Sequence, residues 1–187
     1  MRVLAVILVA LLACACGPES PTEEGGPPAR PLELLQTLPS PGVLRGPDAR
    51  AADPAILQEA FTGEADPALA QIVAARAPSA AAVREWTDPS GGRLVTAVSV
   101  WPSHLVATGI GSDLAARLVA DGGDAWTPSD TPGGRGARRL SGDARELRLG
   151  FSVGPNALYV RATGDVSQDI VTRTMERLRQ VLEGQTG

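Results

Sequence analysis

Ser103 and His104 are the first residues to consider for chemistry, because a serine beside the chain's single histidine could act as a nucleophile with its base. Adjacent residues at the start of a helix do not face each other, however, and no Gly-x-Ser-x-Gly motif surrounds this pair. We therefore expect Ser103 to cap a helix and His104 to lie on the surface.

The sequence contains too few histidine, cysteine and suitably spaced acidic residues for a metal site. One histidine, and no cysteine after position 16, leave too few ligands for a transition metal. Asp121 and Asp124 flank two glycines, but no third acid follows at the spacing of a calcium loop. We expect no metal, no cofactor and no enzymatic activity.

The tryptophans are the first of two groups that could bind a ligand. Trp86, Trp101 and Trp126 make up half of the six aromatic residues. Trp86 and Trp101 are expected near the same end of one β-hairpin, and Trp126 lies in a loop rich in glycine and proline. Grouped indoles could form the floor of a pocket for a sugar, peptide or lipid. Burial in the core, the usual place of tryptophan in a small domain, is the alternative.

The second group is a run of arginines among glycines. Residues 133–139 read Gly-Gly-Arg-Gly-Ala-Arg-Arg. Backbone amides of such a turn, together with Arg135, Arg138 and Arg139, could bind an anionic group. The alternative is a solvated loop that leads into an edge strand.

Two cysteines near the N-terminus indicate a covalent lipid anchor. The chain starts Met1-Arg2 and is apolar over residues 3–13, which is typical of a secretory signal. This run is shorter than the about 20 residues that cross a bilayer. Leu11-Leu12-Ala13-Cys14 resembles the lipobox of bacterial lipoproteins, and the resemblance implies cleavage before Cys14 and a diacylglycerol on its sulfur. Attachment at Cys16 and a disulfide between the two cysteines are the alternatives.

The chain after the signal peptide at 1–13 divides into a tether and a domain. Residues 17–31 contain many prolines and glycines and almost nothing apolar to bury, so residues 14–31 are expected to form the lipidated cysteine and an extended tether. Residues 32–187 are long enough for one domain. The net charge of −4 gives no electrostatic reason to expect nucleic acid or anionic lipid as a partner. All 17 basic residues are arginine, which is typical of GC-rich genomes such as those of actinobacteria.

The first half of the domain predicts helices and then a β-hairpin. Residues 32–38 fit a short helix. Asp-Pro occurs at 53 and at 66, and because Asp is a good N-cap and Pro a good first helical residue, it predicts two helices that form a helical hairpin. Residues 81–87 and 93–101 flank a turn-forming segment and predict a β-hairpin. The second arm is apolar on both faces, which is typical of a central strand covered on both sides.

The second half predicts a helix, another hairpin and a last helix. Residues 105–121 have helical spacing, although Gly109 and Gly111 allow a start as late as Ser112. A loop is expected over 122–136. Residues 147–153 and 158–162 alternate around a turn at Gly154-Pro-Asn156, with Arg148 and Arg161 on the more polar face. The last helix is expected to start at Ser167 and to end at Gly184.

This order predicts an α+β fold: an antiparallel sheet of four or five strands, preceded by a helical hairpin, with helices packed mainly on one face. It resembles the PsbP-like and extracellular sensor-like domains of actinobacterial lipoproteins over roughly residues 80–184. The resemblance rests on the apolar strand before the middle helix, the strand Asn156-Ala-Leu-Tyr-Val160 and the C-terminal helix. It carries no site residues, and the cysteines that staple some such sensor domains are absent here.

These features predict a non-enzymatic, lipid-anchored domain on the outer face of the cell membrane that binds an envelope protein or a small ligand. One alternative is a carrier of a hydrophobic ligand such as a lipid, which predicts an apolar cavity of several hundred cubic ångströms beneath the sheet. Another is a hydrolase of envelope polymers, which predicts two carboxylates that face each other across a cleft.

Overall fold

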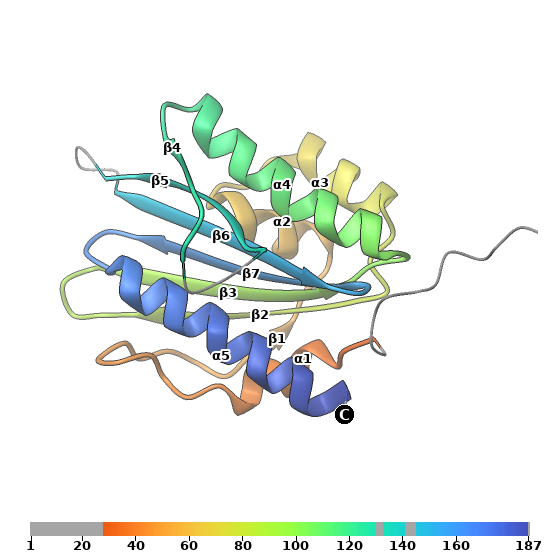
Figure 1. Ribbon diagram of the computed structural model, residues 1–187, viewed down its shortest axis with the longest axis horizontal. Helices are drawn as coiled ribbons and strands as arrows, with labels where there is room; N and C mark the ends of the chain where they lie inside the picture. Colours follow the sequence, from red (N-terminus) through yellow and green to blue (C-terminus); the bar gives the residue numbers. More distant parts are fainter. Residues whose placement is uncertain (1–27, 130–132, 141–144, 187) are drawn as a thin grey trace, which may run out of the picture.

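The described residues form one open antiparallel sheet of seven strands, in the order β1-β2-β3-β7-β6-β5-β4 (Figure 1). The computed structural model describes residues 28–129, 133–140 and 145–186, so the predicted signal peptide, Cys14, Cys16 and most of the tether lie outside the described residues. The strands are β1 (Arg50–Ala51), β2 (Ala80–Thr87), β3 (Arg93–Val100), β4 (Asp124–Trp126), β5 (Arg135–Arg139), β6 (Glu146–Val153) and β7 (Asn156–Thr163). The helices are α1 (Pro31–Thr37), α2 (Pro54–Thr62), α3 (Pro67–Ala75), α4 (His104–Ala120) and α5 (Gln168–Thr186).

The expected number of four or five strands is too low. Two of the strands that were missed are the edge strands β1 and β4, which have two and three residues, and the third is β5, the arginine-rich segment between β4 and β6. Such short strands carry no alternating apolar pattern that a sequence could show. Part of the segment expected to be a loop at 122–136 is therefore paired backbone.

Strand β3 is a central strand, as its sequence predicts. It pairs with β2 on one side and with β7 on the other, and residues 94–100 are all buried. Leu94 and Val98 contribute to the core on one face of the sheet, whereas Val95 and Ala97 contribute to the core on the other.

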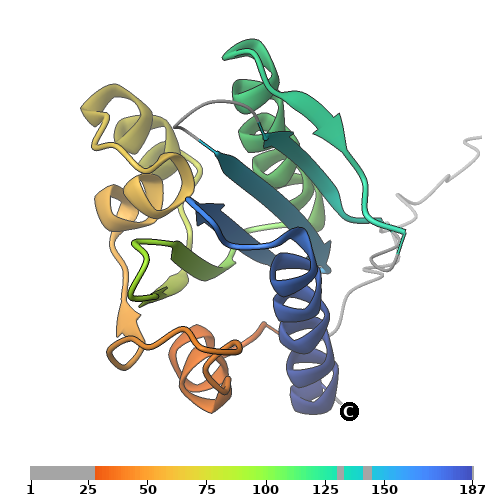
Figure 2. The same ribbon diagram turned by 90° about the vertical axis from the view of Figure 1, so that its left-hand side faces the viewer.

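Helices cover both faces of the sheet, which corrects the expectation that they pack mainly on one (Figure 2). Helices α1 and α5 lie on one face, and α2, α3 and α4 lie on the other. The physical reason is the two-sided apolar pattern of β3 itself, because a second apolar face needs a second layer to exclude water.

The two Asp-Pro helix starts are confirmed. Asp53 accepts a hydrogen bond from the Ile56 amide at 2.8 Å, and Asp66 accepts from the amides of Ala68 and Leu69 at 3.0 and 3.1 Å. Helices α2 and α3 pack against each other as the expected helical hairpin.

Helix α4 starts at His104 rather than at Ser112. Ser103 caps it through a 3.3 Å hydrogen bond from the Val106 amide, and His104 is exposed, as expected, with Nδ1 3.2 Å from the Gly154 carbonyl. The glycines that weaken the helix have a packing role, because a Cβ on Gly150 of β6 would lie 3.0 Å from the Cα of Gly111. Helix α4 therefore approaches the sheet backbone closely at this point.

The second hairpin turns more tightly than expected. Val153 pairs with Asn156, so the turn is Gly154-Pro155 and Asn156 is the first residue of β7. Asn156 is fully buried, and its Oδ1 accepts a 2.7 Å hydrogen bond from the amide of Ala29. The first described residues before α1 are thus fixed to the turn end of the sheet.

A membrane-spanning helix would have to be long and continuously apolar, and no helix in the described part of the chain meets both conditions.

Alanine substitutions at the two touching glycines should have unequal effects. Gly150→Ala should lower the free energy of unfolding by about 1–3 kcal/mol, because its Cβ would press on the α4 backbone. Gly111→Ala, whose Cβ would lie at an ordinary 3.7 Å from Gly150 Cα, should leave stability unchanged or raise it by up to about 1 kcal/mol through helix propensity. Urea unfolding checks both variants, and equal losses would contradict the close approach.

Candidate functional site

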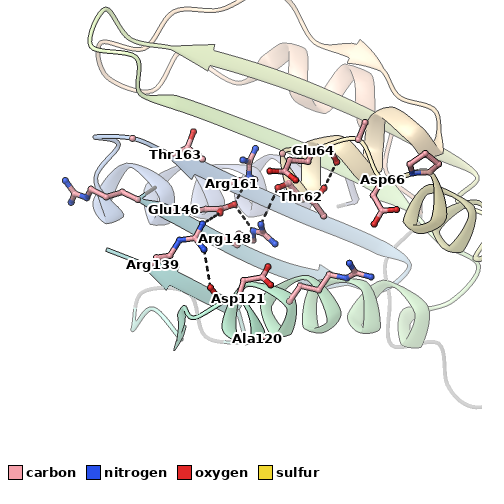
Figure 3. Close-up of a pocket in the computed structure, with 16 residues that line it drawn as sticks. Thr62, Glu64, Asp66, Ala120, Asp121, Arg139, Glu146, Arg148, Arg161 and Thr163 are labelled. Atoms are coloured by element: carbon pink, nitrogen blue, oxygen red, sulfur yellow. Dashed lines mark hydrogen bonds and ion pairs between the residues drawn. The ribbon is translucent and has the colours of Figure 1, made fainter. Parts of the chain in front are cut away.

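A cleft of about 820 Å³ opens on the face of the sheet that carries α2, α3 and α4 (Figure 3). Helix α2 packs over β2 and β3, with α3 against it, whereas α4 packs over β5 and β6. The start of β6 and the end of β7 lie between these two helix groups and form the floor of the cleft, and residues 62–67 and the end of α4 form its walls. The charged residues that line it are Arg117, Arg139, Arg145, Arg148, Arg161, Glu64, Asp66, Asp121 and Glu146.

The floor of the cleft holds one carboxylate that two buried arginines share. Glu146 Oε1 accepts hydrogen bonds from Nε of Arg148 and from Nε of Arg161, both at 2.8 Å. The three residues are 6%, 5% and 9% exposed, respectively. Arg139 adds a longer contact of 3.3 Å from Nη2 to Glu146 Oε2. Figure 3 shows Glu146 between the guanidinium groups.

The pairing of β6 with β7 explains why these residues meet. Arg148 stands directly opposite Arg161 in the register, and like charges at opposed positions destabilise a sheet. Glu146 lies two residues before Arg148 and therefore on the same face of β6. Its carboxylate can reach both guanidinium groups and offsets their repulsion.

The arginines keep Glu146 ionised. Burial alone would raise the pKa of Glu146, but the hydrogen bonds and positive charges of Arg148 and Arg161 outweigh it and hold the pKa below its usual value. The buried group thus contains two positive charges and one negative charge at neutral pH.

The loop after α2 is held in place by buried polar contacts. Gln58, which is 1% exposed, donates to the Glu64 carbonyl at 2.9 Å and accepts from the Asp66 amide at 2.9 Å. Arg148 Nη2 donates to the Thr62 carbonyl at 3.3 Å. Gly63 has a φ of +87°, and a Cβ there would lie 1.9 Å from Nη2 of Arg161. Glycine is required at this position by its backbone and by the guanidinium group beside it.

Tyr159 anchors the same loop from below. Its hydroxyl donates to the Phe61 carbonyl at 2.7 Å, and the two rings meet edge to face with centroids 4.8 Å apart. Burial raises the pKa of Tyr159, so the hydroxyl stays protonated and can donate at any physiological pH. The last turn of α2 is therefore tied to β7 beside Arg161.

This arrangement suits the binding of an anion. Guanidinium groups form strong, directional hydrogen bonds with carboxylate and phosphate oxygens. In the described part of the chain, no group of three or more His, Cys, Asp or Glu side chains is placed to hold a metal ion.

The tryptophans are not brought together. Trp86 is fully buried with α1 and α5 on one face of the sheet, and Trp101, which is 2% exposed, is buried on the other face. Trp86 pairs with Leu94 next to the hairpin turn, whereas Trp101 follows the far end of β3, so their expected placement at the same end is wrong. Trp126 is half-buried against the core of the α1 and α5 face. None of the three lines the cleft.

The arginines of the glycine-rich segment are divided by strand alternation. Arg135 is exposed, and Arg138 lies toward α5, with Nη1 3.4 Å from Gln168 Oε1. Arg139 points to the opposite face of β5 and is the one of the three that lines the cleft. The segment is an edge region of the sheet, because β5 is covered only by the three-residue strand β4.

Glu146, Arg148 and Arg161 were not predicted from the sequence to be site residues. The two arginines lie on the more polar face of the second hairpin, as predicted, but that face is buried here. The signal in the sequence was the position of the turn. Once Val153 is paired with Asn156, counting five residues away from the turn in each strand places Arg148 opposite Arg161. Two arginines in that position require an anion between them or a solvent-exposed face.

The fold is shared with a solved extracellular domain. That domain is the extracellular domain of PknH from Mycobacterium tuberculosis, whose crystal structure matches 86% of this chain and all of its own chain with a TM-score of 0.60. The two sequences are 11% identical, so the likeness concerns the fold alone. It agrees with the expected resemblance to extracellular domains, whereas the resemblance to sensor-like and PsbP-like domains stays a prediction. No family model matches the sequence, and no curated protein matches it.

Replacement of Glu146 by glutamine should destabilise the protein in a pH-dependent way. At pH 7, Glu146→Gln should lower the free energy of unfolding by roughly 3–5 kcal/mol, because two buried arginines lose their carboxylate. Since the folded pKa of Glu146 lies below the ordinary 4.5, the wild-type advantage is complete above that pH and is lost as the pH falls through the folded pKa. Urea unfolding at pH 7 and at pH 3 measures the difference.

The matched control is Glu176→Gln. Glu176 pairs with Arg179 on the surface of α5, so its loss should cost less than about 1 kcal/mol. If Glu146→Gln and Glu176→Gln have the same effect at pH 7, the buried cluster does not stabilise the fold in the way described.

Proposed function

We propose that this chain is a membrane-anchored, extracytoplasmic binding module that takes up an anionic ligand in the cleft, without catalysing a reaction. The observation that carries the proposal is the shared carboxylate: Arg148 and Arg161 are each more than nine-tenths buried and have one acid, Glu146, between them. A ligand that brings a further negative charge would complete the balance.

The cost of burying charge favours such a ligand. An unbalanced positive charge away from water is destabilising, and a bound anion would offset it with charge-assisted hydrogen bonds. Both Nε atoms are used by Glu146, and Nη2 of Arg148 donates to the Thr62 carbonyl, so the outer nitrogens of Arg161 are the donors that a ligand would meet. Arg139 adds positive charge at the rim.

The state of Glu146 supports binding rather than acid catalysis. A general acid must be protonated near neutral pH, whereas the arginines lower the pKa of Glu146. Asp66, another acid at the cleft, is engaged as the N-cap of α3. These two facts weigh against the alternative of a hydrolase with a pair of catalytic carboxylates.

Two further observations support a location outside the cytoplasm. Residues 1–14 have the pattern of a lipoprotein signal, and the fold is similar to that of an extracellular domain. The stretch from Cys14 to Ala29 could hold the domain up to roughly 50 Å from an anchor at Cys14 when fully extended. We infer attachment through Cys14 on the outer face of the cell membrane.

Anion binding is tested with inorganic phosphate by isothermal titration calorimetry on the full-length chain with Cys14 and Cys16 replaced by alanine, so that no lipid is attached. Arg161→Met should weaken phosphate binding by roughly 10- to 100-fold, because it removes a charge-assisted donor. The variant leaves Arg148 and Glu146 as a balanced pair, so the fold should persist, and a thermal melt checks this.

Arg135→Met is the matched control, because Arg135 is exposed and does not line the cleft. Its phosphate affinity should equal that of the parent chain. If Arg135→Met abolishes binding and Arg161→Met does not, the anion binds at the glycine-rich segment and the proposal fails.

The anchor is tested by the intact mass of the protein extracted from bacterial membranes. A diacylglyceryl adduct on the fragment that starts at residue 14 should be present in the wild type and in Cys16→Ala, and absent in Cys14→Ala. The reverse pattern would move the anchor to Cys16, and the absence of an adduct in all three would exclude lipid attachment.

A further inference from the structure

We propose that the ligand of the cleft is an amphiphilic anion, a single-chain lipid with a phosphate head group, whose alkyl chain lies in the groove between α3 and α4. The inference rests on the proposed anion binding, since the head group would occupy the same arginines. It adds a second binding surface that continues from the first.

The groove is apolar and open to solvent. It has a volume of about 390 Å³ and a floor of five buried side chains: Phe61, Leu69, Val73, Ile110 and Leu114. Ile72 on its rim is 48% exposed. An apolar ligand placed here would remove the exposed part of Ile72 from water and would contact the floor side chains.

The groove and the cleft are neighbours at one end of α4. Arg117 and Ala120 line both of them. At the other end of the groove, Arg76 Nη2 and Asp113 Oδ2 form an ion pair of 2.8 Å that joins the end of α3 to α4. The groove is therefore bounded at one end and continues into the arginine cleft at the other. This order of an apolar and a positively charged part matches a lipid with an acidic head group.

Arg117 stands at this junction with its charge uncommitted. It is exposed and makes no side-chain hydrogen bond or ion pair within the described part of the chain. A phosphate head group at the mouth of the cleft could therefore bind both Arg117 and Arg161. The chain's overall charge of −4 does not oppose this, because charges more than about 8 Å apart are largely screened at physiological salt.

The length of the groove matches a short stretch of alkyl chain. From Ile110 to Ala120, the residues of α4 that line the groove, the helix rises by about 15 Å at 1.5 Å per residue. A chain longer than this would leave the groove, so the gain in affinity from added methylenes should reach a limit.

The test is a series of n-alkyl phosphates, from methyl to decyl, titrated as monomers into the same cysteine-free full-length chain, with inorganic phosphate as the reference. Each added methylene should tighten Kd by about fourfold until the groove is full. Neutral octanol should bind far more weakly than octyl phosphate, because it lacks the charge for the cleft.

Two variants locate the alkyl chain. Ala116→Trp, at an exposed position that lines the groove but not the cleft, should reduce the affinity for octyl phosphate to that for methyl phosphate and leave inorganic phosphate unchanged. Ala74→Trp is the matched control, since Ala74 is exposed on α3 outside the groove. Ile72→Ser provides a second test with little risk to folding, and it should weaken octyl phosphate alone.

The outcomes separate this inference from the proposed function. Affinity that does not depend on chain length overturns the inference but leaves anion binding intact. A chain-length effect that Ala116→Trp and Ile72→Ser do not change also overturns it, because the chain would then bind elsewhere. If neither phosphate nor any alkyl phosphate binds, both proposals fail. If Ala116→Trp instead converts a dimer to a monomer in sedimentation, the groove is an interface between copies of the chain and the inference is wrong.

Discussion

Two guanidinium groups held opposite each other on neighbouring strands are the constraint on which the polar half of this structure depends. Arg148 and Arg161 are fixed in position by the pairing of β6 with β7, and Glu146 alone among the acids of the cleft is bonded to both. A slip of one residue by either strand would turn the arginine of that strand into the leucine-rich core on the other face. The cluster therefore favours the native register of β6 and β7, because each of its charges has a partner only in that register.

The neighbouring elements accommodate this cluster instead of covering it. Helices α2 and α4 leave the floor of the cleft between them, and Gly63 lets the intervening loop pass close to Arg161 without a side chain. The separation of α3 from α4 also leaves the apolar groove. Cleft and groove are thus two parts of one gap in the helical layer. The gap is polar over the floor formed by β6 and β7, and it is apolar between α3 and α4.

Local signals in the sequence were sufficient for several elements. The Asp-Pro pairs gave two helix starts, Ser103 gave a third, and the two-sided apolar run identified β3 as central. The same run also predicts helices on both faces of the sheet, because two apolar faces of one strand need a covering layer on each side. Strands β1 and β4 were beyond prediction, because two or three residues pair only when a longer neighbour is already in place. The site was missed for a related reason: the pattern of Arg148 and Arg161 within their own strands is that of a solvent-exposed face, and only pairing between strands shows that it is buried.

If the domain is anchored through Cys14 as proposed, the hydrogen bond between Ala29 and Asn156 has a mechanical consequence. Tension along the N-terminal segment would enter the fold at Ala29 and pass to the turn between β6 and β7. The cleft lies at the opposite end of the same two strands, about 23 Å away at 3.3 Å per residue from Asn156 to Thr163. A pulling force on the N-terminal segment would therefore strain the turn between β6 and β7 first. The arginines of the cleft would keep their geometry under that force.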